Sequence, residues 1–419
     1  MQSGCWNTKG IIMTSSEISR REFIQTSAVT ATGVTGALTA TETALSAESI
    51  DPVKLDSGEK LRLAIIGCGA RSQNHIVGIN HYKNLEIVAI CDILPEMLEE
   101  KGKLIERGAP RRYTDYQKML QQDDIHAVVN ILPNTLHCEM TVASLDAGKH
   151  VLCEKPLANN VTECRQMMKA ADRNRRVLQV GTQSRHNPGF QNLVRQLREG
   201  LVGKPLYGWV HSFRADWRKL DPDPVKDAEI NWRMQMDECG GITYEMGIHL
   251  IDVFNWFIGS APVEVTSMGG INNTKLEKRD SWDHAGVITR YENGAVVNYG
   301  ANLYSCGGPG PDCIFGDGGS LTCEPTYWKE GPVKVTKYNR SYWRPFGMKE
   351  DPEYDVTPLS LPDAPEQPTT LQYDHFYQAC LGQKPPFPSA GEHLKAVQIA
   401  RGSILSTLER RHIRISEVD

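Results

Sequence analysis

The feature that most constrains this chain is a short apolar segment, residues 60–67, which ends on a glycine and is followed by Gly69. The segment predicts a buried strand, and residues 70–81 predict a helix directly after it. Gly67 allows a tight turn between the two, and Gly69 lets the backbone approach a bound group closely. A helix that begins after such a turn offers unpaired N–H groups and the positive end of its dipole, which favours a pyrophosphate.

Strand-like and helix-like segments continue to alternate after this turn. Helices are predicted over residues 95–107, 113–120, 136–147 and 161–174. Further strands are predicted over residues 85–91, 125–132, 151–154 and 177–180. This alternation is typical of an α/β fold, in which helices cover both faces of a parallel, doubly wound sheet of the Rossmann type.

The pattern changes after residue 180. Helices are predicted over residues 188–199, 243–258, 371–381 and 393–410. Polar-alternating strands are predicted over residues 207–215, 285–292, 295–303, 320–324 and 333–338, and Asn293-Gly294 between two of them is a hairpin signal. Loops are predicted over the Gly-, Pro- and Asp-rich residues 304–319 and 345–368. Together these features predict an α+β domain with a mostly antiparallel, open sheet.

Length and composition agree with a chain of several domains. The 419 residues suffice for two or three domains, and 40% of them are hydrophobic, enough for sizeable cores. The net charge of −5 argues against a nucleic-acid partner, and no apolar run is long enough for an integral membrane span. The predicted parts are an export signal with a linker (1–47), a nucleotide-binding Rossmann domain (58–180), a substrate-binding α+β domain (181–392) and a closing helix with a tail (393–419).

The N-terminal segment predicts export. Arg20-Arg21 precedes Phe23-Ile24, a weakly apolar stretch rich in Ala, Thr and Gly follows, and small residues end it near 44–47. This order resembles a twin-arginine signal, although an arginine pair can also arise by chance in an unstructured terminus. Met13 is an alternative start, and cleavage is expected between Ala44 and Glu48. The twin-arginine route carries folded proteins, so we expect a periplasmic or otherwise exported protein that retains its cofactor.

The eleven cysteines do not form a disulfide or zinc pattern. No Cys-x-x-Cys pair occurs, so no metal site is predicted. Cys68, Cys91 and Cys153 lie in or beside apolar strands, where a free cysteine is a normal core residue. Cys306, Cys313 and Cys323 lie close enough in the sequence for a local pairing, which the sequence leaves open.

An acidic residue follows the second predicted strand and supports nucleotide binding. Asp92 lies at about the spacing from Gly67 that ribose-binding carboxylates show. Its carboxylate would bind the ribose hydroxyls and repel a 2′-phosphate, and Ile93 adds no positive charge, so NAD is favoured over NADP. Ser72 stands where a third Gly or Ala is usual. The alternative is a glycine turn used for packing and an aspartate that caps a helix.

Several separated motifs together resemble the Gfo/Idh/MocA oxidoreductase family over roughly residues 60–410. They are Gly67-Cys68-Gly69, Cys91-Asp92, Pro133-Asn134 with His137, Ala147-Gly148-Lys149-His150-Val151 leading into Glu154-Lys155-Pro156, and Gly247-Ile248-His249 with Asp252. The resemblance implies a Rossmann domain followed by an α+β domain whose open sheet often forms an oligomer interface, hence a homo-oligomer. It also implies hydride transfer between NAD(P) and a sugar, inositol or related polyol.

The resemblance also assigns cofactor contacts. The expected residues are Gly67, Gly69, Ala70, Arg71, Ser72, Asp92, Ile93, Leu132, Pro133, Asn134, His137, Glu154, Lys155 and Gln183. Leu132 stands where the family commonly has Thr, so one hydroxyl contact to the nicotinamide ribose is lost. Gln183 belongs to a Gly-x-Gln segment that faces the nicotinamide in the family.

Three residues are predicted to be catalytic. The resemblance places Lys155 beside the nicotinamide and the reacting hydroxyl, although a lysine on such a loop would otherwise be read as a surface residue. Glu245 and His249 are four residues apart, so on a helix they share one face. The ordinary pKa of histidine suits a general base at neutral pH. The family usually has Asp at position 245, which leaves the role of Glu245 in doubt, and a buried structural histidine is the alternative for His249.

Substrate contacts are expected from Arg185, Trp232, Arg233 and Asp252. An indole beside a guanidinium, as in Trp217-Arg218 and Trp232-Arg233, suits a pyranose ring with its hydroxyls or a carboxylate. Packing between domains is an equally good interpretation of these pairs. Asp252, one turn after His249, is also expected to orient it or to hold a helix end.

Three functions are compatible with these motifs. The first is a sugar or polyol oxidoreductase with a tightly bound nicotinamide. The second is an NAD-dependent glycoside hydrolase of the same superfamily, and the third is a non-catalytic protein that binds NAD or a sugar. Because the hydrolase branch departs from Glu-Lys-Pro at residues 154–156, Lys155 favours the oxidoreductase, and Lys155 with His249 argues against the non-catalytic protein.

Overall fold

The structure, a computed structural model, describes residues 50–216, 231–272, 279–305, 311–323, 333–338, 354–359 and 366–419. The predicted export signal, the Trp217-Arg218 pair and Cys306 lie outside these residues. Within them, no helix is both long and apolar enough to cross a membrane. Cys313 and Cys323 are free thiols, so these two are not joined to each other.

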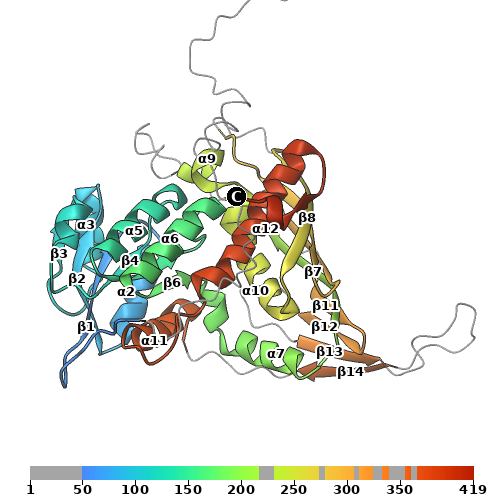
Figure 1. Ribbon diagram of the computed structural model, residues 1–419, viewed down its shortest axis with the longest axis horizontal. Helices are drawn as coiled ribbons and strands as arrows, with labels where there is room; N and C mark the ends of the chain where they lie inside the picture. The colour runs from blue at the N-terminus through green and yellow to red at the C-terminus, as the bar shows by residue number, and fades with distance from the viewer. Residues whose placement is uncertain are drawn as a thin grey trace, which may run out of the picture. The chain divides into compact units, whose positions relative to one another are not determined.

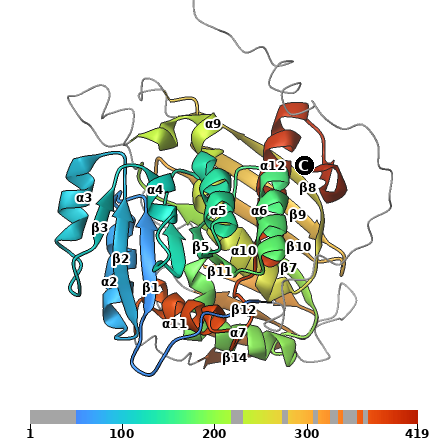
Figure 2. The same cartoon turned by 60° about the vertical axis from the view of Figure 1, so that its left-hand side comes forward.

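Six parallel strands form the first sheet, in the order β3-β2-β1-β4-β5-β6. The strands are β1 (Leu61–Ile66), β2 (Leu85–Cys91), β3 (Arg111–Tyr113), β4 (Ala127–Asn130), β5 (His150–Glu154) and β6 (Leu178–Gly181). The helices between them are α2 (Ser72–His81), α3 (Pro95–Gly102), α4 (Tyr116–Leu120), α5 (His137–Asp146) and α6 (Val161–Asn174). Alternate residues of β1 pack against α2 and against α4, so helices cover both faces (Figure 2). The predicted Rossmann-type sheet is confirmed.

Two local predictions in this domain are wrong. The helix expected over residues 95–107 ends at Gly102. The helix expected over residues 113–120 begins only at Tyr116, where the Asp115 side chain accepts hydrogen bonds from the first turn, and Tyr113 instead ends β3. β3 is a three-residue edge strand that pairs only with β2, too short for its side chains to show a period.

The second sheet has nine described strands in the order β14-β13-β12-β11-β7-β10-β9-β8-β15. They are β7 (Pro205–Phe213), β8 (Pro262–Gly270), β9 (His284–Tyr291), β10 (Val296–Asn302), β11 (Asp312–Gly316), β12 (Gly319–Cys323), β13 (Val333–Tyr338), β14 (Tyr354–Leu359) and β15 (Ile413–Arg414). Only β7 and β10 pair in parallel, and every other neighbouring pair is antiparallel. The predicted mostly antiparallel sheet is confirmed.

Four strands of this sheet were not predicted from the sequence. β11 and β14 lie inside the two segments predicted as loops, and β8 and β15 were not predicted at all. β11 is a five-residue strand held by β7 on one side and β12 on the other, and β14 carries a proline on the outer edge of the sheet. Such strands depend on neighbours that are distant in sequence, so composition alone indicates a loop.

The hydrophobic core beside the second sheet contains residues of three helices, α7 (Pro188–Arg198), α10 (Ile248–Ile258) and α12 (Ala390–Glu409). Helix α11 (Pro368–Cys380) instead returns to the first domain and packs beside α2 (Figure 1). Tyr373 and Phe376 of α11 are fully buried in one core with β1. The chain therefore crosses back to the nucleotide-binding sheet after it has formed the second sheet.

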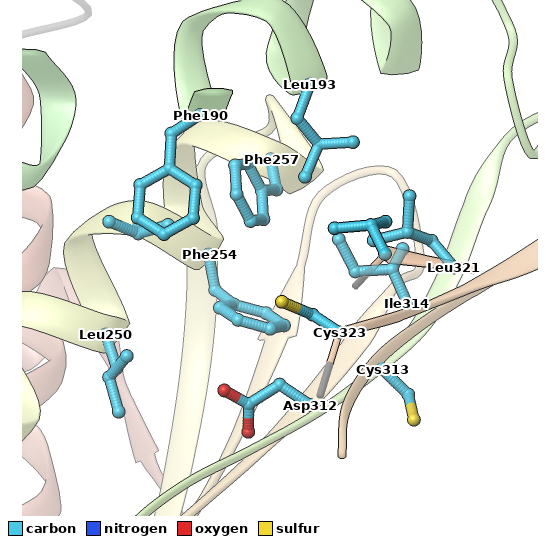
Figure 3. A pocket seen from close by; sticks show the side chains of 12 residues that line it. Phe190, Leu193, Leu250, Phe254, Phe257, Asp312, Cys313, Ile314, Leu321 and Cys323 are labelled. Atoms are coloured by element: carbon cyan, nitrogen blue, oxygen red, sulfur yellow. The ribbon is translucent and has the colours of Figure 1, made fainter. Parts of the chain in front are cut away.

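A small cavity of about 40 Å³ lies between α7, α10 and strands β11 to β13. Figure 3 shows the Cys323 sulfur and the Phe254 ring directed into it, while the Cys313 sulfur points away. Its walls are almost entirely apolar, and neither Lys155 nor His249 lines it. A space of this size and lining is a packing defect of the second core and not the substrate site.

Candidate active site

The glycine turn after β1 has the strained geometry that the sequence predicts. Gly67 has φ +92°, and a Cβ there would lie 2.6 Å from the Ile131 carbonyl oxygen. Gly69 has no atom within 4 Å of its Cβ position, so its surface is open. The Ser72 hydroxyl donates to the Gly69 carbonyl at 2.7 Å. Serine thus replaces the usual third small residue without disturbing the turn, because its hydroxyl closes the turn itself.

We expect Gly67→Ala to destabilise the fold and Gly69→Ala to leave stability unchanged. A side chain at residue 67 requires an unfavourable φ and meets the backbone of Ile131, just after β4, at a cost of about 2 kcal/mol or more. The matched Gly69→Ala variant places its methyl group where a pyrophosphate would approach, so it should weaken NAD binding only. Chemical denaturation and NAD titration of both variants separate the two effects, and equal stability of both variants would contradict the assignment.

Asp92 lies at the end of β2, beside the glycine turn. Its Oδ2 accepts from the Cys68 backbone N–H at 2.6 Å, and its Oδ1 accepts from the Leu94 N–H at 2.9 Å. The first turn of α2 contains no acidic residue and no side-chain cap. An open glycine turn, an uncapped helix N-terminus and a carboxylate after β2 together fit a dinucleotide. Ala70 is exposed on this turn, and Ile93 beyond Asp92 is 74% exposed.

The segment after β4 joins the two domains. η2 (Asn134–Leu136) follows Leu132 and Pro133. The Asn134 amide donates to Glu245 Oε1 at 3.0 Å and to the Cys239 carbonyl at 3.1 Å. The buried His137 ring lies 2.7 Å from the Pro156 carbonyl and 2.9 Å from that of Leu132. Asn134 and His137 thus fix the positions of the catalytic candidates, and their predicted contacts with the nicotinamide ribose stay predictions.

Glu154 is the centre of a buried network that sequence reasoning missed. Its Oε1 accepts from Arg71 Nε at 2.8 Å and lies 2.8 Å from His75 Nε2, and His75 Nδ1 lies 2.6 Å from the Tyr373 hydroxyl. Burial raises the pKa of the Glu154 carboxyl, but Arg71 and His75 outweigh it and hold that pKa well below its ordinary value. Through Arg71, the glycine turn therefore contacts the Glu-Lys-Pro motif directly.

Lys155 follows Glu154 and reaches across to the second domain. Its Nζ donates to the Glu245 carbonyl at 3.0 Å and lies 3.8 Å from Glu245 Oε2. Burial lowers the pKa of Lys155, while the carboxylates of Glu245 and Glu154 partly offset that effect. A buried lysine with a lowered pKa can exchange a proton near neutral pH more readily than a surface lysine.

Glu245 lies in η5 (Thr243–Gly247), a π-helical turn that leads into α10. The regular helix predicted over residues 243–258 therefore begins with a wider turn, a feature common at functional sites. Glu245 Oε2 accepts from Arg233 Nε at 2.6 Å. Burial raises the pKa of its carboxyl, yet Lys155 and Arg233 outweigh burial and the pKa falls to about 2. Glu245 is thus a permanent anion that holds two cations.

We expect Glu245→Gln to lower stability at neutral pH by about 2 kcal/mol and to remove part of the acid sensitivity. The folded-state pKa of about 2 lies below the ordinary value of 4.5, so the carboxylate stabilises the fold above pH 4.5 and this contribution is lost as pH falls toward 2. In urea unfolding experiments, the difference in the free energy of unfolding between wild type and variant should become smaller from pH 7 to pH 3. Glu199→Gln, in an exposed pair with Arg195, is the control. A gap that is constant with pH would contradict the assignment.

His249 is buried on α10, 5% exposed. Burial, and then the charge of Lys155, lowers the pKa of its imidazole well below the ordinary value, while Glu154 and Glu245 act in the opposite sense. Lys155 contacts Glu245 directly, and the charges of both residues act on His249, which lies four residues after Glu245 in the chain. A neutral imidazole beside a lysine is suited to accept a proton.

Asp252 and Arg185 form a buried pair. Arg185 lies in η3 (Gln183–His186) and donates from Nε to Asp252 Oδ2 at 2.7 Å and from Nη2 to Oδ1 at 3.0 Å. His393 Nδ1 of α12 lies 3.4 Å from Asp252 Oδ1. The pair holds η3, with Gln183, against the helix that carries His249. The expected role of Asp252 in orienting His249 or holding a helix end stays a prediction, as do substrate contacts of Arg185 and Asp252.

Trp232 and Arg233 lie in η4 (Trp232–Met234) at the entrance to the cluster. The Arg233 guanidinium carbon stacks 4.1 Å from the centre of the Trp232 ring. The side chain of Arg233 keeps 36% of its surface exposed although its Nε is bound to Glu245. The stacking and the contact with Glu245 are compatible with both interpretations offered by the sequence, packing and ligand binding, so substrate contacts of Trp232 and Arg233 stay predictions.

Comparison with known proteins identifies the family. A family description reading "Oxidoreductase family, NAD-binding Rossmann fold" matches residues 61–182, and one reading "GFO/IDH/MocA C-terminal domain" matches residues 190–322. The chain belongs to the Gfo/Idh/MocA oxidoreductase family. Its first domain is therefore the NAD-binding domain of that family, in agreement with the open glycine turn and Asp92. In the described ranges, no group of three or more His, Cys, Asp or Glu side chains is arranged to hold a metal ion.

Several curated relatives are similar to this chain. It is 29% identical over 226 residues to a glycosyl hydrolase family 109 protein of Shewanella pealeana, covering 49% of each chain. It is 27% identical over 238 residues to myo-inositol 2-dehydrogenase of Thermotoga maritima, covering 56% of this chain and 66% of that one. It is 24% identical over 364 residues to D-apiose dehydrogenase of Paraburkholderia graminis, covering 86% and 91%. The chain thus spans about half to two thirds of the length of the first two relatives.

Solved structures share the fold. An aldose-aldose oxidoreductase from Caulobacter crescentus, complexed with glycerol, has a TM-score of 0.70 at 21% identity, with 85% of this chain and 100% of that chain covered. An oxidoreductase from Agrobacterium radiobacter, in complex with NAD+, L-tartaric acid and magnesium, has a TM-score of 0.68 at 19% identity, with 85% and 99% covered. At these identities the likeness establishes the two-domain architecture.

Proposed function

We propose that this protein is an NAD-dependent oxidoreductase that transfers a hydride between the nicotinamide and a hydroxyl-bearing carbon of a sugar, polyol or related derivative. The observation that carries the proposal is the convergence of Lys155, Glu245 and His249, next to a Glu154 that Arg71 connects to the glycine turn. The family's dehydrogenase relatives, named for inositol and for apiose, support a sugar or polyol substrate.

Each residue of the cluster has a distinct task. When bound, NAD supplies the carbon that accepts the hydride. Lys155 donates a hydrogen bond to the substrate oxygen, and its lowered pKa lets it stabilise the alkoxide that develops there. His249, neutral at pH 7, accepts the hydroxyl proton. Glu245 keeps its charge and positions Lys155 and Arg233 through its backbone and side-chain oxygens.

NAD is proposed over NADP. The Asp92 carboxylate, which lies beside the glycine turn, is expected to bind the ribose hydroxyls and to repel a 2′-phosphate. The neighbouring Ile93 is exposed and uncharged, so it offers no partner to such a phosphate. We also propose that the protein is exported by the twin-arginine route with its nicotinamide tightly bound, because an exported enzyme has no free pool of that cofactor. The signal that supports export lies in residues 1–47.

An NAD-dependent glycoside hydrolase is the second candidate. The match to a glycosyl hydrolase family 109 protein supports it, since such a reaction also begins with removal of a hydride from a sugar carbon. Glu154-Lys155-Pro156 favours the oxidoreductase, because the hydrolase branch departs from this motif. A non-catalytic binding protein is disfavoured by Lys155 and His249, whose lowered pKa values serve proton transfer and not ligand binding alone.

The decisive experiment uses the chain from residue 48 onward, folded in the cytoplasm and purified without added cofactor. A panel of sugars and glycosides is added, and the near-ultraviolet absorbance of reduced nicotinamide is recorded. A stoichiometric rise with a free sugar, reversed by a second carbonyl compound, is the expected result. Glycoside cleavage with a nicotinamide spectrum that recovers unaided would favour the hydrolase. Protein purified without any nicotinamide would refute the retained cofactor.

A homo-oligomer formed through the second sheet is also proposed. Strand register places Trp209, Ile288, Met268 and Phe315 on the sheet face opposite α10, and all four are at least 36% exposed. An apolar face of this kind is usually covered by a partner, here a second copy of the same face. Light scattering is expected to give a multiple of the monomer mass, and Ile288→Lys should reduce it. A monomeric wild type would contradict the proposal.

A further inference from the structure

The guanidinium of Arg233 is held in a fixed orientation at the entrance to the catalytic cluster. Trp232 supports one face of it at 4.1 Å, and Glu245 Oε2 binds its Nε at 2.6 Å. These two contacts fix the plane of the guanidinium and leave its two Nη groups without a protein partner among the described residues. The Arg233 side chain as a whole is 36% exposed, so part of it remains open to a ligand.

Five charged side chains form the cluster that Arg233 belongs to. Arg71, Lys155 and Arg233 are the cations of the cluster, and Glu154 and Glu245 are its two carboxylates. Each carboxylate is buried and already bound, Glu154 by Arg71 and His75 and Glu245 by Arg233 and Asn134. His249 adds no charge at neutral pH, since burial lowers its pKa. An oxidised nicotinamide beside this cluster would add another positive charge.

We propose that the substrate is an acidic sugar, a uronate or an aldonate, whose carboxylate binds the Nη edge of Arg233 while its reacting hydroxyl lies between Lys155 and His249. The assignment rests on the proposed oxidoreductase function and specifies the substrate class of that same site. The fork of an arginine matches the two oxygens of a carboxylate, and a pre-oriented fork loses little freedom on binding. The carboxylate is only an anchor: the carbinol carbon gives up a hydride to NAD, its hydroxyl proton goes to His249, and the acid group is unchanged.

A neutral sugar and a phosphorylated sugar fit this site less well. A neutral sugar leaves the Nη edge of Arg233 without a charged partner. A phosphate dianion is usually held by several cations or by a cluster of backbone N–H groups. Here a single guanidinium with one accessible edge faces the ligand, which suits a carboxylate of one negative charge.

The test compares substrates that differ only in the acid group. The holoenzyme from residue 48 onward is assayed with D-glucuronate, D-glucuronamide, D-glucose and D-glucose 6-phosphate, and with the matching galactose series. We expect kcat/KM for the uronate to exceed that for the amide of the same skeleton by about 10- to 100-fold. The preference should shrink as ionic strength rises, because it is electrostatic.

Three arginine variants assign the preference to Arg233. Arg233→Gln should bring the uronate-to-amide ratio close to one, and Arg233→Lys should retain part of the ratio, because it keeps the charge but loses the fork. Arg195→Gln, on the exposed face of α7, should leave the ratio unchanged. A purely structural effect of Arg233→Gln, acting through Glu245, would slow all substrates alike and leave the ratio at its wild-type value, which would overturn the assignment.

The outcomes separate this inference from the proposed function. Turnover of neutral sugars without preference for uronates, or a preference for the phosphate ester, overturns the inference and leaves the oxidoreductase intact. Absence of turnover with every probe is a failure of the proposed function. In that case calorimetric binding of D-glucuronate against D-glucuronamide still decides the inference, since binding that is specific for the acid and lost in Arg233→Gln supports it, and equal or absent binding overturns it.

Discussion

Replacement of Lys155 by Met is expected to lower kcat by about 10²- to 10⁴-fold while NAD binding stays within a few-fold of wild type. The Lys155 side chain is 13% exposed and its ammonium donates to the Glu245 carbonyl, so the ammonium is held beside Glu245. Methionine keeps the length and apolar stem of lysine and removes only the ammonium. The loss therefore reports on the proton and hydrogen bond that Lys155 supplies to the substrate oxygen.

The same substitution at Lys169 is the matched control. Lys169 lies on the exposed side of α6, away from the cluster, and Lys169→Met should leave kcat unchanged. NAD affinity is measured by titration and kcat by nicotinamide absorbance, and circular dichroism checks the fold. Glu245 retains Arg233 and Asn134 as partners in Lys155→Met, so a folded protein is expected. A variant that keeps more than about a tenth of wild-type kcat would rule out Lys155 as a proton donor or acceptor.

The first sheet could be predicted from the sequence because its long strands are mostly apolar and alternate with segments that form helices. β1 and β2 are such strands, and the glycine turn that joins β1 to α2 carries its own conformational signature at Gly67. β3 and β11 could not be predicted in the same way. Each has five residues or fewer, and each is specified by hydrogen bonds to strands formed elsewhere in the chain.

The candidate site shows a similar division. Lys155, Glu245 and His249 were identified from short motifs, and the structure brings all three together. The contacts of Glu154 with Arg71 and His75 span 83 and 79 residues, and the contact of His75 with Tyr373 spans 298. No local spacing could indicate them. A histidine on the inner face of α2 is indistinguishable in sequence from a core residue, and only the register of α2 against β5 and α11 reveals its partners.

Asn134 illustrates a residue whose motif was found but whose protein contacts could not be predicted. The family resemblance predicts a contact with the nicotinamide ribose, whereas the structure directs its amide to Glu245 and to the Cys239 carbonyl in the second domain. One amide thus connects the nucleotide-binding segment to the catalytic carboxylate. The longer side chain of Glu245, compared with the usual aspartate, is what brings Oε1 to 3.0 Å from Asn134 while Oε2 stays bound to Arg233.

Replacement of His249 by Asn should also lower kcat/KM by about 10²- to 10⁴-fold and, in addition, remove the acidic limb of its pH profile. Burial and the charge of Lys155 depress the pKa of His249 well below the ordinary value of 6.5, so the imidazole is neutral at pH 7. A base of depressed pKa is active above that pKa and inactive below it. Oxidation by the wild type should therefore stay constant through pH 7 and decline only in more acidic solution.

His412→Asn provides the control, because His412 is exposed near the C-terminus and should change neither the rate nor the profile. In His249→Asn the residual rate should no longer decline at the acidic pH where the rate of the wild type declines. In a second variant, His249→Ala, added imidazole should restore part of the rate, because removal of the buried ring leaves a space of the same shape. If the acidic limb persists in His249→Asn but disappears in Lys155→Met, then Lys155 is the base and His249 positions it. The lowered pKa of both groups makes each chemically competent, and only this comparison of profiles assigns the proton to one of them.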